Sequence, residues 1–235
     1  MVTDNPIIVA LDLPTAEQAV DIAQRVSPHV GAFKIGLGLL HGPGPATIDA
    51  LVRIGRPVFA DAKLHDIPSQ VRAAAERLGN HGARWVTAHV SGGIDMLQAA
   101  VEGLEVGAGD ASAGVLGVSV LTSLAKPDLE RVGIQRSPGQ LVGKMAKVAA
   151  AAGCEGLVCS PQELNVVAQA APGLLRVTPG IRPTEVDDDQ ARTATPSDAI
   201  EKGASLLVIG RPITQAADPA TAAATILADI TRSRP

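Results

Sequence analysis

The sequence predicts an α/β fold, a (β/α)8 TIM barrel in which residues 1–235 form a single domain. Eight short runs rich in Val, Ile, Leu and Ala recur along the chain, and each is continuous rather than alternating, as in parallel strands buried on both faces. Ala-rich segments with helical periodicity separate most of these runs. The length of 235 residues also suits such a barrel, which commonly reaches ~250 residues as one unit.

The apolar runs place the expected strands in order along the chain. They are 7–12 (IIVALD), 32–36 (AFKIG), 57–63 (PVFADAK), 85–90 (WVTAHV), 114–122 (GVLGVSVLT), 156–160 (GLVCS), 174–180 (LLRVTPG) and 206–211 (LLVIGR). A doubly wound open sheet would use the same strand–helix units. Eight regular units, with no strand that leads into a GxGxxG turn, favour the closed barrel.

Helix signals fall between these runs. Helices are expected over 14–26, 68–82 and 195–203. In the last of them Thr195 can cap the first turn, Pro196 suits the first helical position and Gly203 can end the helix. These signals support the alternation of strands and helices that a barrel requires.

Three further segments are expected to be loops. The stretch 36–44 (GLGLLHGPG) has glycines but lacks the third glycine of a dinucleotide-binding turn, and 103–114 (GLEVGAGDASAG) is rich in small residues. The polar stretch 182–194 follows the seventh expected strand, on the face where the active sites of barrels lie. It is therefore the best candidate for a lid.

Composition and charge exclude several classes of function. The net charge is -4, and no cluster of Lys and Arg or ladder of aromatic residues indicates a nucleic-acid partner. The start of the chain lacks a basic region followed by a long apolar one, and no apolar run approaches the ~18 residues of a membrane span. We therefore expect a cytoplasmic protein without a membrane partner. Cys154 and Cys159 fit neither a disulfide scaffold nor a zinc site and are expected to be small core residues.

Charged residues interrupt or end the first three expected strands. Asp61 and Lys63 are two apart on a strand, so they share a face, and at the end of a buried barrel strand that face points inward. Lys34 interrupts the second strand and Asp12 ends the first. Asp66 lies just past the third strand and can turn toward its own barrel or toward a neighbouring subunit. The five charges alternate in sign.

Two interpretations of these charges remain open. A buried charge is costly unless it is paired, so the residues can form a neutralising salt-bridge network that closes the barrel. Five such charges on the functional face of one barrel favour an active site instead. A lysine between two carboxylates keeps its proton. Lys63 is therefore expected to act as an acid that stabilises negative charge, rather than as a Schiff-base nucleophile, which needs a neutral amine.

A second group of residues follows the seventh and eighth expected strands. Arg182, Gln190 and Arg211 lie there, and Gly210 exposes a backbone N–H near a helix start. Barrels commonly bind phosphate at this position. The sequence therefore predicts a phosphorylated substrate.

The motifs DAKLHDIP, VALDLPT, KIGLGLL, VLTS, TPGIRP and VIGRPIT together resemble those of the orotidine 5'-phosphate decarboxylase family over about residues 7–220. A DxKxxD motif alone is shared with sugar-phosphate decarboxylases and synthases of the same barrel superfamily. Its combination with TPGIRP and GRPIT is far more specific. The resemblance implies decarboxylation of orotidine 5'-monophosphate to uridine 5'-monophosphate in pyrimidine synthesis, without a cofactor or a metal, through a carbanion at C6 of the ring.

The resemblance also implies roles for individual residues. Lys63 stabilises the carbanion and delivers the proton, Asp61 lies against the departing carboxylate, and Asp66 is contributed by the partner subunit of a homodimer. Asp12 and Lys34 bind ribose hydroxyls. Thr122 in VLTS hydrogen-bonds the pyrimidine. The phosphate site consists of Arg182, Gln190, Gly210 and Arg211.

The chain departs from the family pattern at two adjacent positions of the central motif, Ser69 and Gln70. The usual DIPNT reads DIPSQ, so Gln70 replaces a threonine that is expected to reach the ribose across the dimer interface. Two rival functions also stay open. One is a metal-dependent sugar-phosphate decarboxylase or aldol-type synthase, for which Asp61 would be a Mg²⁺ ligand. The other is a phosphate-binding barrel with a regulatory function.

Overall fold

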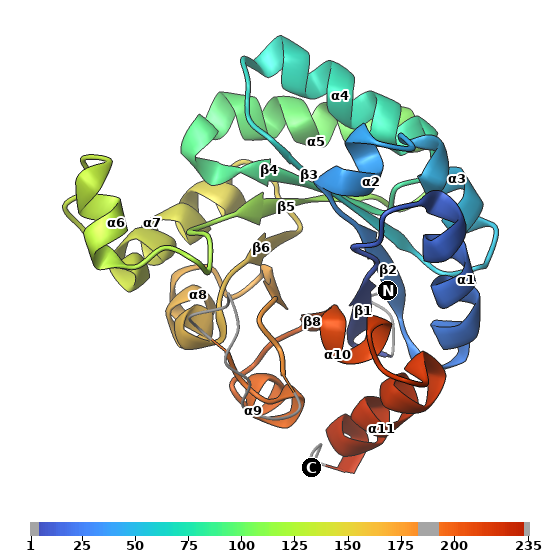
Figure 1. Ribbon diagram of the computed structural model, residues 1–235. Coiled ribbons are helices and arrows are strands. Elements are labelled where there is room, and N and C mark those ends of the chain that lie inside the picture. The colour runs from blue at the N-terminus through green and yellow to red at the C-terminus, as the bar shows by residue number, and fades with distance from the viewer. Residues whose placement is uncertain (1–4, 183–192, 233–235) are drawn as a thin grey trace.

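Eight parallel strands close into a barrel in the computed structural model, which describes residues 5–182 and 193–232 (Figure 1). The strands are β1 (Ile7–Ala10), β2 (Ala32–Ile35), β3 (Val58–Leu64), β4 (Trp85–His89), β5 (Gly114–Val118), β6 (Gly156–Val158), β7 (Leu175–Thr178) and β8 (Leu206–Ile209). Each strand pairs with the next in the sequence, and β8 pairs with β1. The predicted barrel is confirmed, and the open sheet is not formed.

Helices surround the strands, and most lie on the outside of the barrel (Figure 1). They are α1 (Ala16–Val26), α2 (Leu37–His41), α3 (Ala46–Val52), α4 (Pro68–Asn80), α5 (Ile94–Ala108), α6 (Lys126–Arg131), α7 (Pro138–Ala151), α8 (Leu164–Ala170), α9 (Pro196–Glu201), α10 (Arg211–Thr214) and α11 (Pro219–Arg232), with the 3-10 turns η1 (Ser27–His29), η2 (Val90–Gly92) and η3 (Pro161–Glu163). The helix α6 stands away from the barrel in this view.

Two of the three predicted helices begin at a side-chain cap. The hydroxyl of Thr15 accepts a hydrogen bond from the N–H of Gln18 at 3.3 Å and begins α1. The hydroxyl of Thr195 accepts one from the N–H of Asp198 at 3.2 Å and begins α9. Each cap satisfies one of the backbone donors that the first turn of a helix leaves without a partner. Gly203, past the end of α9, has a φ of +92°, which a glycine adopts without strain.

The interior of the barrel is apolar below the ends of the strands. A cluster of inward-facing residues fills it: Ile8, Ala10, Ala32, Phe59, Trp85, Leu116, Val177, Leu206 and Val208. Trp85, at the start of β4, is 1% exposed, and its Nε1 donates a hydrogen bond to Glu155 at 3.0 Å. Arg84 donates two further hydrogen bonds to the same carboxylate. This cluster makes the interior a packed core rather than a pore.

The expected loop at 103–114 is wrong in its first half, because α5 continues to Ala108. Gly103 and Gly107 face α4 instead of breaking the helix. A Cβ added to Gly103 would lie 2.2 Å from the carbonyl oxygen of Arg72, and one added to Gly107 would lie 2.1 Å from that of Glu76. The absence of side chains therefore lets α4 and α5 pack with their backbones in close contact, and Figure 1 shows them side by side.

The other two expected loops have different outcomes. The stretch 36–44 contains the short helix α2, so the prediction that it is a loop is wrong for residues 37–41. Residues 183–192 of the predicted lid lie outside the described residues. At its two ends, the N–H of Arg182 donates to the carbonyl of Ala194 at 3.0 Å, and the N–H of Ala194 donates to Gly180 at 3.2 Å. These hydrogen bonds hold the two ends of the segment together.

The membrane prediction can be examined on the same described residues. Within 5–182 and 193–232, none of the helices combines the length and the apolar character that a bilayer crossing requires.

Candidate active site

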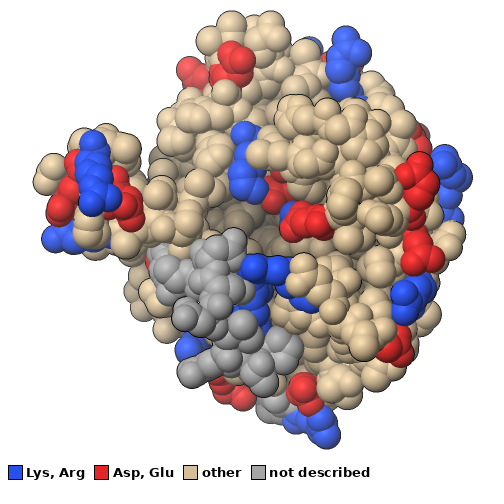
Figure 2. Space-filling model, viewed as in Figure 1, with Lys and Arg blue, Asp and Glu red and all other residues tan. Residues whose placement is uncertain are grey.

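A pocket of about 560 Å³ opens at the C-terminal ends of the strands. This volume lies within the range of ~300–1,000 Å³ that is usual for sites of small molecules and cofactors. Figure 2 shows a hollow near the centre of this face, with Lys or Arg and Asp or Glu side chains around it. The end of a parallel barrel at which the strands finish is where enzymes of this fold carry their catalytic residues.

The floor of the pocket is apolar. It includes Ala10, Phe59, Val118, Val158 and Val208, each from a different strand. Inward-facing side chains alternate along a strand, so the next inward positions on β1, β2 and β3 carry the charged residues of the pocket. Lys34 and Asp61 therefore lie directly above an apolar surface, where water screens their charges less than it does in solution.

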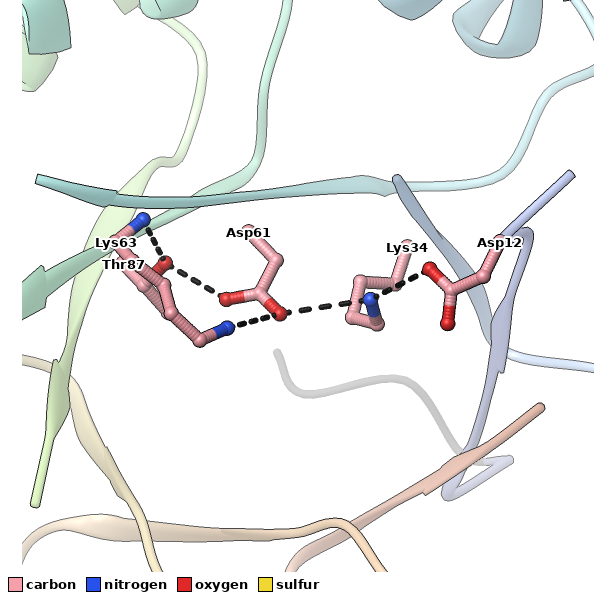
Figure 3. A network of polar contacts seen from close by, with 5 residues as sticks. All are labelled: Asp12, Lys34, Asp61, Lys63 and Thr87. Carbon is pink, nitrogen blue, oxygen red and sulfur yellow. Dashed lines mark hydrogen bonds and ion pairs between the residues drawn. The ribbon is translucent and has the colours of Figure 1, made fainter. Parts of the chain in front are cut away.

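Four of the predicted charges form one continuous chain of ion pairs (Figure 3). The Nζ atom of Lys63 lies 2.6 Å from Oδ2 of Asp61, and the Nζ atom of Lys34 lies 3.4 Å from the same oxygen. Lys34 also lies 3.3 Å from Oδ1 of Asp12. The side chains of Lys34 and Asp61 are 9% and 14% exposed, whereas that of Asp12 is 64% exposed. The network thus extends from a buried centre to the solvent.

Asp61 is the centre of this network. Burial by itself raises the pKa of its carboxyl group, but the ammonium groups of Lys34 and Lys63 and the hydrogen bonds from Lys63 and Thr87 outweigh burial. The net effect is a pKa below the usual value for aspartate. Asp61 is therefore a carboxylate at neutral pH, and it carries its negative charge into the pocket.

The backbone at Lys63 departs from a regular strand. Its φ is +48°, in the left-handed region that costs a residue with a side chain of the order of 1–3 kcal/mol. The register between β3 and β4 shifts between Ala60 and Leu64. Asp61 and Lys63 do point to the same place, as expected, but the regular alternation of a strand is not the whole reason. The irregular backbone sets the direction of Lys63.

Thr87, on β4, is a residue of the site that the sequence analysis missed. It is fully buried, and its hydroxyl accepts a hydrogen bond from the N–H of Lys63 and donates one to Oδ1 of Asp61, both at 2.9 Å. Trp85 and His89 precede and follow it at intervals of two, so Thr87 lies on the inward face of β4. A polar residue at an inward position was the signal that could have identified it.

Two histidines lie beside the network. The ring centroids of His65 and His89 are 5.4 Å apart. Burial, together with electrostatic interaction with His65 and Lys63, lowers the pKa of His89 below its usual value. His89 is therefore neutral at pH 7 and adds no positive charge beside Lys63.

Asp66 does not join the ion-pair network within one chain. It is exposed, and its Oδ1 accepts a hydrogen bond from the N–H of Ile67 at 2.6 Å. Residues 65–70 are all exposed, including Gln70, and Ile67 is 62% exposed. Among the residues that the structure describes, no ion pair joins Asp66 to Lys63.

The predicted phosphate residues line the opposite side of the pocket. Arg182 and Arg211 face it, Gly210 precedes α10 there, and Thr122 lies four residues past the end of β5. Arg182 is 8% exposed, and its Nη1 donates a hydrogen bond to the carbonyl of Ile181 at 3.0 Å. Gln190 lies outside the described residues. Two further polar residues that were not predicted, Thr214 and Gln215, also line this part of the pocket.

Cys159 also lines the pocket, although Cys154 does not. Both thiols are buried and unbonded, as expected for core residues. Burial raises the pKa of each thiol to about 12, so neither is a nucleophile at neutral pH. Within the described part of the chain, no group of three or more His, Cys, Asp or Glu side chains is arranged to hold a metal ion.

Comparison with known proteins relates this chain to one family. A family model described as "Orotidine 5'-phosphate decarboxylase / HUMPS family" matches residues 5–226. A protein named orotidine 5'-phosphate decarboxylase from Anaeromyxobacter sp. (strain K) is 46% identical over 226 residues, which cover 95% of this chain and 97% of that protein. A protein of the same name from Pseudomonas aeruginosa (strain LESB58) is 43% identical over 227 residues, which cover 96% and 97%.

A solved structure gives the same result. The crystal structure of orotidine 5'-phosphate decarboxylase from Lactobacillus acidophilus matches with a TM-score of 0.85 and 36% identity, and the match covers 97% of this chain and 99% of that one. Because the family model and these relatives match nearly the whole chain, the protein belongs to the orotidine 5'-phosphate decarboxylase / HUMPS family.

Proposed function

We propose that this chain decarboxylates orotidine 5'-monophosphate to uridine 5'-monophosphate and CO₂ in pyrimidine biosynthesis, without a cofactor. The observation that carries the proposal is the position of Lys63, whose ammonium group lies 2.6 Å from Asp61 at the mouth of a pocket with an apolar floor. The relatives described above are named as this enzyme, and the chain matches nearly the full length of each of them. This similarity supports the same activity here.

Lys63 is the proposed acid. The bond between C6 and the carboxylate carbon breaks, its electron pair stays on C6, and CO₂ leaves. The ammonium group stabilises this pair electrostatically and then gives its proton to C6. At an effective dielectric of ~20, two unit charges ~4 Å apart interact by ~4 kcal/mol. The largest enzymatic rate accelerations need ~20 kcal/mol or more of transition-state stabilisation. Lys63 alone therefore does not account for the whole acceleration.

The other charges of the network have proposed roles in the same step. Asp61 lies against the substrate carboxylate, and its low pKa supports this role because it remains charged. Asp12 and Lys34 bind ribose hydroxyls. The ion pairs of Lys34 with both Asp12 and Asp61 support this arrangement, because they fix the ammonium group between the two carboxylates at the pocket wall.

Phosphate binding is proposed for the opposite rim. Arg182 and Arg211 supply positive charge, and Gly210 supplies a backbone N–H at the start of α10, while Thr122 hydrogen-bonds the pyrimidine. Gln190 is proposed as a further phosphate ligand. Energy from a remote phosphate can be used to close the site and exclude water, which raises the rate of the chemical step.

We also propose a homodimer in which Asp66 reaches the network of the partner subunit. The exposure of residues 65–70 and of the large apolar side chain of Ile67 supports a partner at this surface. Gln70 lies in the same segment and takes the place of the threonine of the usual motif. The cytoplasmic location and the organisation of 1–235 as a single domain remain predictions from the sequence.

The test is the loss of absorbance of orotidine 5'-monophosphate in the presence of EDTA. The wild-type protein is expected to turn the substrate over, and Lys63→Ala to lose turnover. Arg211→Ala is expected mainly to raise KM and to lower kcat less. An unchanged kcat in Lys63→Ala would refute the assignment of the acid. Nucleotide binding without any turnover by the wild type would favour the regulatory barrel.

The metal-dependent rival is not supported. Its Mg²⁺ site would need a second carboxylate beside Asp61, and the ammonium group of Lys34 lies 3.4 Å from Asp61 at that place. The ammonium group of Lys34 beside Asp61 opposes the binding of a second cation there. Loss of activity on chelation would support that rival, and undiminished activity in EDTA would exclude it.

A further inference from the structure

We propose that Thr87 is a positioning residue for the reaction, through a hydroxyl that joins the carboxylate of Asp61 to the backbone of Lys63. The inference rests on the proposed function, since it concerns Asp61 and Lys63, the two residues proposed to act at the reacting bond. Nothing in the resemblance assigned a role to Thr87. The evidence consists of its two hydrogen bonds, its complete burial and the irregular backbone that it contacts.

The direction of both hydrogen bonds is fixed by chemistry. The backbone N–H of Lys63 can only donate, so the Thr87 oxygen accepts from it at 2.9 Å. An ionised Asp61 can only accept, so the single hydroxyl proton points to its Oδ1, also at 2.9 Å. The low pKa of Asp61 is consistent with the same arrangement. One hydroxyl thus uses its donor and one acceptor on two different residues of β3.

The two oxygens of Asp61 have different partners (Figure 3). Oδ1 accepts from Thr87, and Oδ2 faces the ammonium groups of Lys63 and Lys34. A carboxylate held at one oxygen only can rotate about its last torsion, which is broad in energy. The bond from Thr87 removes this freedom. It therefore determines where Oδ2, and the ammonium group that Oδ2 holds, lie in the pocket.

The same hydroxyl also holds the backbone of Lys63. The pairing of β3 with β4 joins Ala60 to Val86 and then Leu64 to Ala88, with a shift of register between them. In this interval the N–H of Lys63 bonds to the side chain of Thr87, and Lys63 has its φ of +48°. Lys63 is thus fixed at both ends, because Thr87 holds its N–H and Asp61 holds its Nζ.

The two hydrogen bonds of Thr87 and the ion pair between Asp61 and Lys63 predict an effect on the chemical step rather than on substrate binding. Thr87 does not line the pocket and is fully buried, so it makes no direct contact with a bound nucleotide. A displacement of ~1 Å in a reacting group can cost ~100-fold in rate. A change at Thr87 is therefore expected to lower kcat by about 10- to 100-fold, with KM within about threefold of the wild type.

The experiment compares Thr87→Val with Thr87→Ser in the full-length protein. Valine keeps the shape and the β-branch but lacks the hydroxyl, whereas serine keeps the hydroxyl and lacks the methyl group. We expect the predicted loss of kcat in Thr87→Val and a kcat within about threefold of wild type in Thr87→Ser. If Thr87→Val does not fold, Thr87→Ala provides the second variant without a hydroxyl, and the same loss is expected. Equal kcat values for Thr87→Val and wild type, or equal losses in the valine and serine variants, overturn the inference.

Crystal structures of the two variants provide a readout that does not depend on activity. We expect Thr87→Ser to keep the left-handed backbone of Lys63 and the orientation of Asp61, and Thr87→Val to change at least one of them. An unchanged geometry at both residues in Thr87→Val overturns the inference even if the wild type proves inactive. Inactivity of the wild type would instead refute the proposed function, so the two failures are distinguishable.

Discussion

The close packing of α4 against α5 gives a stability prediction that can be worked from the structure. Gly103 faces α4, and a Cβ at this position would lie 2.2 Å from the carbonyl oxygen of Arg72, where ordinary contacts begin at 3.4 Å. The neighbouring atoms belong to a helix backbone, so no side-chain rotamer can relieve the clash. The substitution Gly103→Ala must therefore separate the two helices by about 1 Å.

Two opposing terms set the magnitude. Overpacking of a well-packed interior typically costs ~1–3 kcal/mol, and a clash with backbone belongs at the upper end of that range. Alanine in place of glycine inside a helix returns ~1 kcal/mol. The net loss is then ~2 kcal/mol. A protein of this size loses ~2–4 °C in Tm for each kcal/mol, so Tm is expected to fall by ~4–8 °C.

Thermal unfolding followed by calorimetry or circular dichroism measures this shift. Gly139→Ala is the matched control, because Gly139 is also helical, in α7, and its added Cβ would meet nothing within 4 Å. The control is expected to unfold at or above the Tm of the wild type. A Tm for Gly103→Ala equal to or higher than that of the wild type would show that the helices do not depend on this contact.

Three further predictions concern the pH dependence of stability, the reactivity of the thiols and the binding of the ribose. The folded-state pKa of Asp61 is lowered, so its contribution to stability is complete above the unfolded value of ~3.9 and is lost as the pH falls through the lower folded value. The free energy of unfolding, measured with urea, is expected to decline below about pH 4, and Asp61→Asn is expected to flatten this decline. With a pKa of about 12, the thiols of Cys154 and Cys159 have about a thousandth of the thiolate fraction of an ordinary cysteine. Iodoacetamide at pH 8 is therefore expected to label them only after unfolding. Rapid labelling of the native protein would contradict this. A Cβ at Gly36 would lie 3.0 Å from Oδ1 of Asp12, so Gly36→Ala is expected to displace that carboxylate and raise KM several-fold, and steady-state kinetics with an unchanged KM would argue against a role in ribose binding.

The barrel and most of the charged network could be predicted from sequence because both follow from local patterns. A strand buried on both faces is a continuous apolar run, and a charge at its end can only point into the mouth of the barrel. Asp61 and Lys34 meet for this reason, whereas the direction of Lys63 depends also on its irregular backbone. Their exact distances depend on the register of three neighbouring strands, which the local sequence does not specify.

The features that could not be predicted depend on contacts between distant segments. Thr87 reaches Lys63 only because the register of β3 and β4 shifts between them, and a lysine with a positive φ has no signature in the sequence. Gly103 looked like a loop residue because glycine breaks isolated helices, whereas here the closeness of α4 makes glycine necessary. The position of Asp66 in the proposed dimer cannot be derived from one chain.

The position of the single tryptophan, at the start of β4, has a practical consequence for experiments on this protein. The chain has one tryptophan and no tyrosine, so its ultraviolet emission comes from Trp85 alone. That indole stacks under the guanidinium of Arg84, 4.6 Å from the ring centroid, and belongs to the apolar cluster inside the barrel. A change in this fluorescence during denaturation therefore reports the unfolding of the apolar cluster inside the barrel. For the same reason, the protein adds little background when the absorbance of the pyrimidine is followed.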